Sequence, residues 1–512
     1  MPAYNFIIVD AYTSRSFKKR VAKYTPLIGE DYQLTFKYKV MGQPLGDYYV
    51  TFDLANLNKN VLVSKSKTGL QTITHNFGRI PLDGEIPWQI QVDPFSTAGG
   101  ADPNKSPAKP KIPDLSTGGL VNKSSKQSDL EITTKKNITG ILRPQAPANS
   151  VDYFETVRIK GSQQINITFK PKGQISKMAL MMAQPATASW QAMASSSCTA
   201  NVSGIYNEEV KPLLATADRF WPLYFWEIEK VAAKSTVFKQ DFIVEVNNQR
   251  VNGSNLRKAT WAKLEALEGN DFTYYTQPES VIESNNAKIT NFVKQVLGAK
   301  YRTKLQPYDA ARQIFQAIVK HVTYTFPENG AEDMRGHTSV EVLDKKRGDC
   351  GGFSLLIVGC LRNMGIPART ACGFWIGASA HCWCEFYLPG HGWILCDGSA
   401  SKSWSEYGEY AYCFGNQFDL NSRIAFMRGN TFKVGEYETS WLQGPAGPWL
   451  TGTAQTEEVL HKHIVEEVPT YKVKRLVTNS SGKRIRKMAF QCPCEARGGF
   501  RLDNAALKSH HE

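Results

Sequence analysis

Residues 347–369 read RGDCGGFSLLIVGCLRNMGIPAR, and this stretch decides how the central part of the chain is interpreted. Cys350 is followed by two glycines and then by an apolar run that extends to Leu361. Gly365 and Pro367 come shortly after the run, and both residue types mark helix ends. The pattern therefore predicts a buried helix whose first turn carries Cys350.

A cysteine in the first turn of a helix is suited to nucleophilic chemistry. The thiolate is the reactive form of the side chain, and the unpaired N–H groups and positive dipole end of the helix favour it. The same N–H groups can supply one donor of an oxyanion hole. Cys350 is therefore the candidate nucleophile.

Three strand-like runs follow, ARTACGFWIG at 368–377, HCWCEFYL at 381–388 and GWILCDGS at 392–399. His381 opens the second run and Asp397 lies near the end of the third. If the LPGHG segment forms a tight turn, the two strands pair as a hairpin and bring His381 near Asp397 at its open end. A nucleophile on a helix, a base on a strand and an orienting acid on the next strand form the arrangement of an activated nucleophile.

The order of these motifs resembles the core of the transglutaminase-like superfamily. The motifs are GDC opening the helix, GIPAR at its end and HCWCEFYLPGHGWILCD after it, within about residues 285–430. The resemblance implies a papain-like α+β fold, with the cysteine helix packed on an antiparallel sheet. It also implies that Cys350 is the nucleophile, His381 the general base and acid, and Asp397 the residue that orients the imidazole. The superfamily forms a thioester from a glutamine or peptide carbonyl and passes the acyl group to an amine or to water.

The chain departs from part of this family pattern. Animal-type members place a Trp directly after the nucleophile, where this chain has Gly351, and the sequence is closer to the microbial group of proteases, amidases and inactive scaffolds. No acidic loop has the spacing of a calcium site, so we expect no metal and no cofactor. The second oxyanion donor stays open, and the loop at 322–340 offers Tyr324, Asn329 and His337 as candidates.

Composition divides the rest of the chain into β-rich segments and a linker. Alternating apolar and polar residues predict strands early in the chain, and a small, polar, Pro-rich stretch interrupts them. Helical periodicity starts later, at 289–298 and 308–321. We expect a multidomain fold of two β-rich, sandwich-like domains, an α+β papain-like core and a short basic β-hairpin tail. The expected parts are a β-sandwich-like domain at 1–96, a linker at 97–128, a second β-rich domain at 129–270, the transglutaminase-like domain at 271–450 and a C-terminal extension at 451–512.

Several conspicuous side chains have simple structural interpretations. The aromatic run FWPLYFW at 220–226 is more typical of a core or an inter-domain contact than of a binding platform. His391 lies in a turn, where an exposed side chain is a simpler interpretation than a competing base. Cys492 and Cys494 are interpreted as loop thiols.

Four cysteines in the strand-like runs form another group. C-x-C pairs on strands fit the ligand spacing of zinc sites poorly. We therefore expect packing as small hydrophobic residues, on the sheet face that points away from His381, for Cys372, Cys382, Cys384 and Cys396.

The formal net charge is +14, and basic residues concentrate in YKVKRLVTNSSGKRIRKMAF at 471–490, where a turn is predicted at 479–482. This tail could bind an acidic partner or an anionic surface, although a solvated basic ribbon is the simpler interpretation. Nucleic acid is not favoured as a partner, because no aromatic stacking platform is interleaved with the basic residues.

Cellular location is indicated only indirectly. The apolar runs are far shorter than the roughly 18–20 residues of a transmembrane helix, and the first residues lack the features of a secretory signal. The cysteines lie mostly in apolar runs and are interpreted as reduced thiols. A cytoplasmic or virion-associated location is therefore expected.

Two hypotheses of different classes follow. The first is a cysteine enzyme that performs acyl transfer, or hydrolysis as a protease or amidase, on protein or peptide amides. Transfer and hydrolysis both stay open, because access of the acceptor decides between them. The second hypothesis is a structural or assembly protein in which the transglutaminase-like core is a non-catalytic scaffold.

Overall fold

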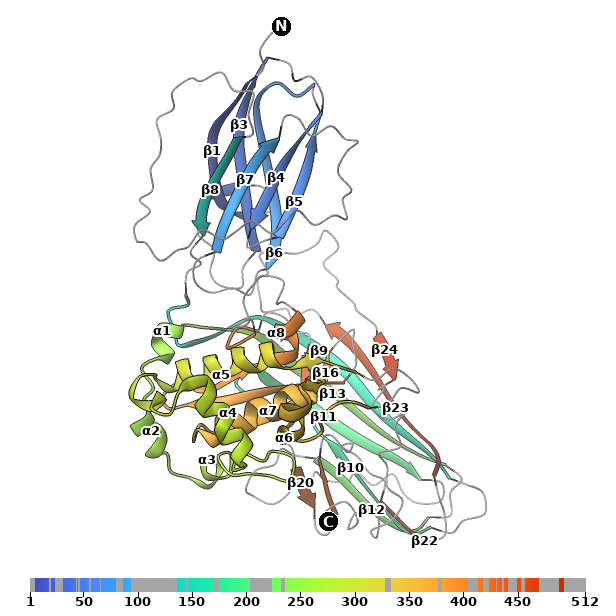
Figure 1. The fold of residues 1–512 in the computed structure, drawn as a ribbon. Coiled ribbons are helices and arrows are strands. Elements are labelled where there is room, and N and C mark those ends of the chain that lie inside the picture. The colour runs from blue at the N-terminus through green and yellow to red at the C-terminus, as the bar shows by residue number, and fades with distance from the viewer. Residues whose placement is uncertain are drawn as a thin grey trace. The chain divides into compact units, whose positions relative to one another are not determined.

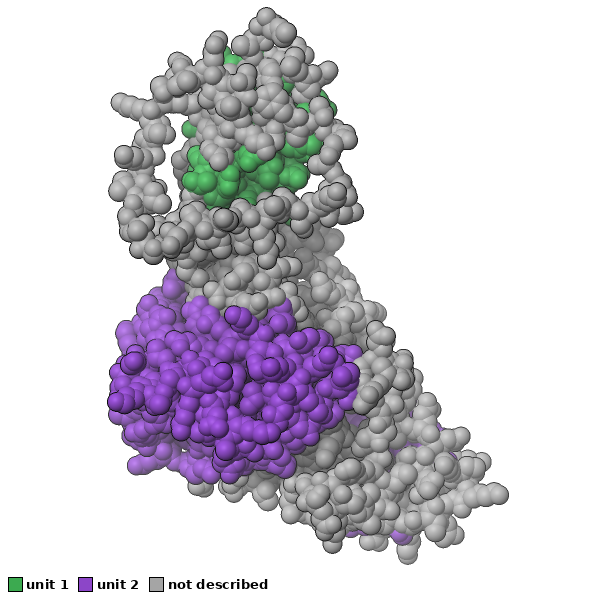
Figure 2. Space-filling model, in the orientation of Figure 1, with its two compact units in different colours: residues 1–145 green, residues 146–512 purple. Residues whose placement is uncertain are grey.

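A computed structural model gives the fold of the chain, which divides into unit 1, residues 1–145, and unit 2, residues 146–512 (Figure 2). The described residues are 5–17, 20–23, 31–42, 44, 47–54, 57–64, 66–79, 86–93, 136–142, 146–169, 175–202, 223–231, 235–326, 333–375, 380–403, 413–417, 423–429, 431–434, 437–440, 449–452, 456–468 and 488–491.

Unit 1 contains two four-stranded antiparallel sheets (Figure 1). The first sheet has the order β2-β1-β3-β6, with β1 at Asn5–Phe17, β2 at Arg20–Lys23, β3 at Asp31–Met41 and β6 at Gly69–Arg79. The second has the order β5-β4-β7-β8, with β4 at Tyr48–Leu54, β5 at Leu57–Val63, β7 at Ile86–Asp93 and β8 at Lys136–Leu142. Buried and half-buried residues alternate along β4, as expected for a strand with one face toward a core.

Aromatic side chains connect the two sheets of unit 1. Tyr38 on β3 and Tyr48 on β4 are fully buried, and their hydroxyl oxygens are 2.9 Å apart. Phe6 on β1 packs against Tyr48 with ring centroids 4.9 Å apart. Because these contacts join the faces of two sheets, unit 1 is a β-sandwich.

Unit 1 extends beyond the boundary predicted at residue 96. Strand β8 pairs with β7 from Ile86↔Leu142 to Val92↔Lys136 and so completes the second sheet. The sequence pattern places this strand in a second β-rich domain that starts at 129. The alternation within a strand does not identify its partner, so the pattern could not assign β8 to unit 1. The predicted linker at 97–128 lies outside the described residues.

The β-rich part of unit 2 is a second pair of packed sheets. The larger has the order β11-β13-β9-β23-β24, with β9 at Val151–Phe169, β11 at Gln191–Val202, β13 at Ser235–Val251, β23 at Thr456–Val468 and β24 at Met488–Gln491. The smaller has the order β12-β10-β22, with β10 at Ile175–Ala183, β12 at Leu223–Val231 and β22 at Trp449–Gly452. Tyr224 and Trp226 of β12 pack with Phe238 of β13 between these sheets, so this part of the aromatic run is core. Residues 220–222 of the run lie outside the described residues.

The helices of unit 2 gather away from β10, β12 and β22 (Figure 1). They are α1 Gly253–Leu256, α2 Trp261–Glu265, α3 Asn270–Tyr274, α4 Ala287–Leu297, the 3₁₀ turn Tyr301–Thr303, α5 Pro307–His321, α6 Ser339–Lys345, α7 Cys350–Asn363 and α8 Gly398–Ser403. Helices α4 and α5 confirm the helices predicted from periodicity. Gly298 ends α4 with a φ of 80°, a conformation that glycine adopts without strain.

A four-stranded antiparallel sheet of order β18-β17-β16-β19 supports these helices. Its strands are β16 Ala368–Trp375, β17 Ala380–Leu388, β18 Gly392–Cys396 and β19 Arg423–Arg428. Two short ladders, β14 Thr323–Tyr324 with β15 Arg347–Gly348 and β20 Thr431–Val434 with β21 Tyr437–Ser440, accompany it. Within the described ranges, none of the helices has both the length and the apolar character needed to cross a bilayer.

The two faces of this sheet meet different partners. Leu356 of α7 shares a hydrophobic cluster with Phe386 and Ile394 on one face. On the other face, Trp383 and Phe426 pack with Val244 of the long strand β13. The sheet is therefore buried between helix α7 and the β-rich part of unit 2.

Unit 2 does not divide at the predicted boundaries. Leu256 and Leu264, before residue 271, belong to the same hydrophobic cluster as α7. Strand β23, after residue 450, pairs along β9 and returns the chain to the larger sheet. Strand β24 pairs with β23, whereas the residues between them, with the turn predicted at 479–482, lie outside the described residues.

Candidate active site

Helix α7 begins at Cys350, which confirms the position predicted for the candidate nucleophile. Asp349 is the N-cap, and its Oδ1 accepts a hydrogen bond from the backbone N–H of Gly352 at 3.0 Å. An aspartate there compensates a free N–H group at the start of the helix. The residues from Gly351 to Arg362 are buried, whereas Cys350 is partly exposed. The sulfur therefore lies at the edge of a fixed helix.

His381 and Asp397 meet at the open end of the β17–β18 hairpin. His381 Nε2 and Asp397 Oδ2 are 2.7 Å apart, and both residues are buried. A hydrogen bond also joins the side chains of His381 and Cys350. Since Nε2 contacts the carboxylate, Nδ1 is the ring nitrogen left to face the thiol. The structure thus brings together the three residues that the sequence selects.

Both oxygens of Asp397 have several hydrogen-bond donors. Oδ1 accepts from Ser399 Oγ at 2.8 Å and from the backbone N–H of Ala400 at 2.9 Å. Oδ2 accepts from Arg423 Nη1 at 2.5 Å, besides its contact with His381. The carboxylate is therefore held in one orientation.

Arg423 is a residue that the sequence reasoning missed. It begins strand β19, lies 26 residues after Asp397 and has an exposed fraction of 0%. The available signal was a charged residue at the start of the apolar run IAFM. Such a residue is often exposed at a strand end, so the signal did not identify Asp397 as its partner.

The protonation equilibria of the His381–Asp397 pair follow from their mutual contact. Burial lowers the pKa of His381, but the Asp397 charge and hydrogen bond outweigh it and raise the pKa to about 9. Burial alone would raise the pKa of Asp397, yet the charges of His381 and Arg423 hold it well below its usual range. The pair therefore favours an imidazolium next to a carboxylate.

Cys350 has a second sulfur neighbour in Cys382. The Cys382 side chain and burial raise the pKa of the Cys350 thiol, whereas the contact with His381 lowers it. The net effect is a raised pKa of Cys350, so the protonated thiol is the resting form of the site. Ionisation of Cys350 consequently depends on the neutral form of His381, which can accept its proton.

The four strand cysteines are buried in hydrophobic clusters, as predicted for small packing residues. Helix α7 covers their side of the sheet and places Cys350 against Cys382. His381 reaches the same sulfur from the end of β17. The strand cysteines form two cross-strand pairs, with Sγ–Sγ distances of 2.8 Å for Cys372–Cys382 and 3.3 Å for Cys384–Cys396.

Other candidate ligands and bases lie elsewhere. In the part of the chain that the structure describes, no group of three or more His, Cys, Asp or Glu residues is placed to hold a metal ion. His391 Nδ1 lies 2.9 Å from Ser150 Oγ, at the turn between β17 and β18. Cys492 and Cys494 lie outside the described residues.

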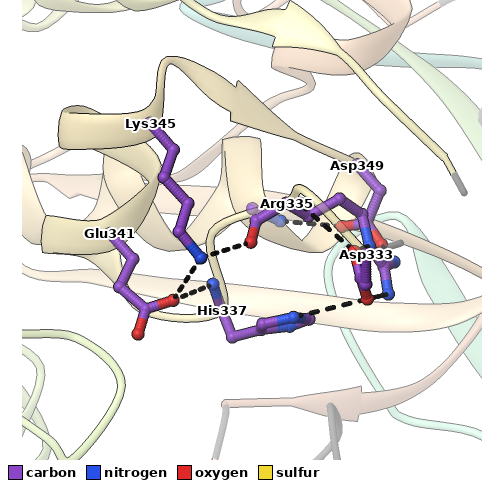
Figure 3. Close-up of polar contacts among 7 residues, drawn as sticks. Asp333, Arg335, His337, Glu341, Lys345 and Asp349 are labelled. Atoms are coloured by element: carbon purple, nitrogen blue, oxygen red, sulfur yellow. Dashed lines mark hydrogen bonds and ion pairs between the residues drawn. The ribbon is translucent and has the colours of Figure 1, made fainter.

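A polar network fixes the loop at 333–337 to the start of α7 (Figure 3). Arg335 is 9% exposed and donates to Asp333 at 2.8 Å and 2.6 Å. It also donates to Asp349 Oδ2, so the N-cap carboxylate binds both the helix N-terminus and this arginine. Lys345 Nζ donates to the Arg335 carbonyl at 3.0 Å, and Glu341 accepts from the His337 backbone N–H at 3.0 Å. The loop is therefore anchored at both ends.

This network bears on the three candidate oxyanion donors. The His337 ring lies 3.4 Å from Asp333 and is directed toward it, and Asn329 lies outside the described residues. Tyr324 lies near Cys350: burial and the charge on that sulfur raise the pKa of its phenol, and its ring stacks on Phe353 of α7 at 6.5 Å. Of the two described candidates, Tyr324 is therefore the one beside the nucleophile.

Comparisons with known proteins match one part of the chain to a family. Residues 294–398 match the sequence model described as "Transglutaminase-like superfamily". A comparison with curated protein sequences found no match.

Three solved structures are similar to parts of the chain. A candidate cysteine protease from Cytophaga hutchinsonii is 14% identical, with 63% of this chain and 94% of that chain covered and a TM-score of 0.43. A structure described as a TGase is 15% identical, covering 33% and 42% of the two chains with a TM-score of 0.19. A candidate protease from Parabacteroides distasonis is 8% identical, covering 77% and 70% with a TM-score of 0.19. On the strength of the sequence match, residues 294–398 form a domain of the transglutaminase-like superfamily.

Proposed function

We propose that the protein is a cysteine enzyme that cleaves protein or peptide amides through a thioester and passes the acyl group to an amine or to water. The observation that carries this proposal is the position of His381, which contacts Cys350 on one side and Asp397 on the other. A thiol, an imidazole and a carboxylate in this order can move one proton without exposing the charge to bulk water.

The proposed reaction begins from the neutral form of His381, to which Cys350 transfers its proton. The thiolate attacks the amide carbonyl and forms a C–S bond, while the carbonyl oxygen takes up negative charge. In this proposal, a backbone N–H group at the start of α7 and the Tyr324 hydroxyl donate to that oxygen. The C–N bond then breaks, and His381 returns its proton to the leaving nitrogen.

The second half of the reaction decides between transfer and hydrolysis. His381 accepts a proton from the incoming amine or water, which attacks the thioester carbonyl and releases Cys350. Asp397 holds the ring throughout and stabilises its protonated form. An amine acceptor gives a crosslink or a modified glutamine, and water gives an acid.

A donor–amine assay tests the proposal. The full chain is incubated with a glutamine-containing peptide and a labelled primary amine, and both ammonia and incorporated label are measured. Label incorporation that requires Cys350 supports transfer, and ammonia without label supports hydrolysis of the side-chain amide. Cleavage of the peptide backbone supports the protease alternative.

The matched controls are Cys350→Ala and Cys360→Ala. Cys360 lies on the same helix and is fully buried in the hydrophobic cluster, so its loss changes packing without removing the candidate nucleophile. Turnover that survives in Cys350→Ala would contradict the proposal.

A non-catalytic scaffold is the second candidate function. The raised pKa of the Cys350 thiol is the observation that favours it, because a protonated thiol is a poor nucleophile. A thiol-reactive probe separates the two candidates. Labelling of Cys350 that falls strongly in His381→Ala indicates an activated nucleophile, and labelling that does not change indicates a scaffold.

Binding of the basic tail to an acidic partner or an anionic surface is also a proposal. The net charge of +14 and the basic residues of 471–490 support it. Retention of the full chain on anionic vesicles at low salt, compared with a chain in which the basic residues of 471–490 are replaced by Gln, tests this binding.

A further inference from the structure

Arg423 places a permanent charge next to the proposed proton-transfer site. Its Nη1 is 2.5 Å from Asp397 Oδ2, and its guanidinium carbon lies 5.6 Å from the centre of the Trp383 ring. The exposed fractions are 0% for Arg423 and 1% for Asp397. Because neither charge is in water, their interaction is screened far less than that of a surface ion pair.

The same carboxylate oxygen serves both cations. His381 Nε2 is 2.7 Å from Asp397 Oδ2, the atom that also accepts from Arg423. A buried carboxylate with no other charged partner would strongly stabilise an adjacent imidazolium. Here Arg423 already balances the carboxylate charge, whatever the protonation state of His381.

We propose that Arg423 is a positioning residue that holds Asp397 and limits how strongly this carboxylate stabilises the imidazolium form of His381. The inference rests on the proposed function, since it concerns the base of the same reaction. A weaker hold on the proton increases the neutral fraction of the imidazole at any pH below its pKa. The neutral ring is the form that can accept a proton from Cys350.

Charges on the surrounding elements are compatible with this role. The Arg423 charge lowers the pKa of His381, opposite to the effect of Asp397. The groups that act on the charge of His381 are Asp397 after β18, Arg423 on β19 and Cys350 at the start of α7. Around Cys350 lie Cys382 on β17, with Cys372 on β16 and Asp349 acting on Cys382. Tyr324 on β14 is influenced by Cys350, Asp349, Asp397 and Arg335. Among these side chains Arg335 is the other permanent cation, and it donates hydrogen bonds to Asp333 and Asp349.

Two substitutions separate charge from position. Arg423→Gln removes the charge but keeps an N–H donor for Asp397, and Arg423→Lys keeps the charge. Arg428→Gln is the matched control, because Arg428 lies on the same strand and donates to the buried carboxylate of Glu385 at 2.9 Å. It therefore removes a similar ion pair without touching Asp397.

The experiment follows alkylation of Cys350 by iodoacetamide across pH, quantified by mass spectrometry of the Cys350 peptide in the full chain. The His381-linked inflection is defined as the one that disappears in His381→Ala. We expect Arg423→Gln to move this inflection up by on the order of one pH unit, because a nearby positive charge has been removed. Arg423→Lys and Arg428→Gln are expected to leave it in place.

An inflection that stays in place in Arg423→Gln would overturn the proposal, as would an equal shift in Arg428→Gln. If Arg423→Gln does not fold, the titration midpoint of the His381 ring is measured by NMR in wild type and in Arg423→Lys instead. Equal midpoints support the role of the charge, and midpoints that differ by about one unit contradict it. Alkylation needs no turnover, so a shifted profile in a chain without amidase or transferase activity leaves this inference standing and refutes only the proposed function.

Discussion

At the scale of single residues, the site depends on the contact between His381 and Asp397. The sequence identified both, because each lies at a strand end within a recognisable motif. It could not identify Arg423 or the contact between Cys350 and Cys382, since these depend on how strands and helices pack. Spacing along the chain predicts neighbours within a hairpin, but it does not predict partners that come from separate elements.

The raised pKa of His381 predicts a pH-dependent contribution to stability. The folded-state pKa of about 9 lies above the ordinary value of 6.5, so the stabilisation is complete below about pH 6.5 and is lost as the pH rises through 9. We expect the difference in unfolding free energy between wild type and His381→Gln to fall over this window, by on the order of 2–3 kcal/mol. Chemical denaturation of both proteins at several pH values measures it.

His391→Gln is the control for this titration. Burial lowers the pKa of His391, so its contribution has the opposite sign and disfavours the fold at low pH. The idea fails if the wild-type advantage over His381→Gln is independent of pH between 6.5 and 9.

At the scale of elements, the N-cap of α7 is expected to affect both the stability of the helix and the reactivity of Cys350. Asp349 caps Gly352 and also accepts from Arg335. We expect Asp349→Ala to lower the free energy of unfolding by about 1 kcal/mol through the lost cap, as is typical of such substitutions. We also expect it to slow alkylation of Cys350. Asp349→Asn keeps the cap acceptor and should cost less. Denaturant unfolding and the Cys350 labelling rate are the two measurements.

The matched control is Thr338→Ala, which removes the N-cap of α6. Thr338 Oγ1 accepts from the Glu341 backbone N–H at 3.2 Å, and α6 does not carry the nucleophile. A similar loss of stability without a change in labelling is expected. Equal effects of Thr338→Ala and Asp349→Ala on labelling would show that the cap acts only through global stability.

Strand packing behind the site tolerates no added atom at Gly373. A Cβ at this position would lie 1.8 Å from the Ile424 carbonyl oxygen, next to Arg423, while Gly373 is also paired with His381 across β16 and β17. We therefore expect Gly373→Ala to separate β16 from β19 and to destabilise unit 2 more than Gly359→Ala, whose added Cβ would meet the Ser339 Cβ at 3.1 Å. Thermal unfolding of the two variants compares them, and equal midpoints would contradict the expectation.

Elements were more predictable than their partners. The helix at Cys350 and the hairpin of β17 and β18 follow from apolar periodicity, stop signals and turn residues, all of which are local. The packing of Cys350 against the cysteine face could not be predicted, because it depends on which sheet face α7 covers. The assignment of β8 to a different domain differs from the structure for a similar reason, since β8 pairs with β7, which lies far from it in the sequence.

At the scale of the whole molecule, the residues of the candidate site belong to unit 2. Cys350, His381, Asp397 and Arg423 contact one another within residues 146–512. We expect a chain of residues 146–512 to keep the Cys350 labelling rate of the full chain. A chain that ends at residue 430 is the control, because it lacks β22 and β23 and exposes the partners of both strands. Loss of labelling in the 146–512 chain would show that unit 1 contributes to the site.

Strand β23 has a consequence for biosynthesis. It fills the position beside β9, a strand made roughly three hundred residues earlier, and the register runs from Thr456↔Phe169 to Val468↔Arg158. A ribosome therefore releases the finished helices and the β16–β19 sheet well before the larger sheet can close. During that interval the edge of β9 is unpaired, and such edges invite pairing with other chains. Nascent chains stalled before residue 456 should thus bind chaperones longer than chains stalled after residue 491, which links the order of synthesis to the risk of aggregation.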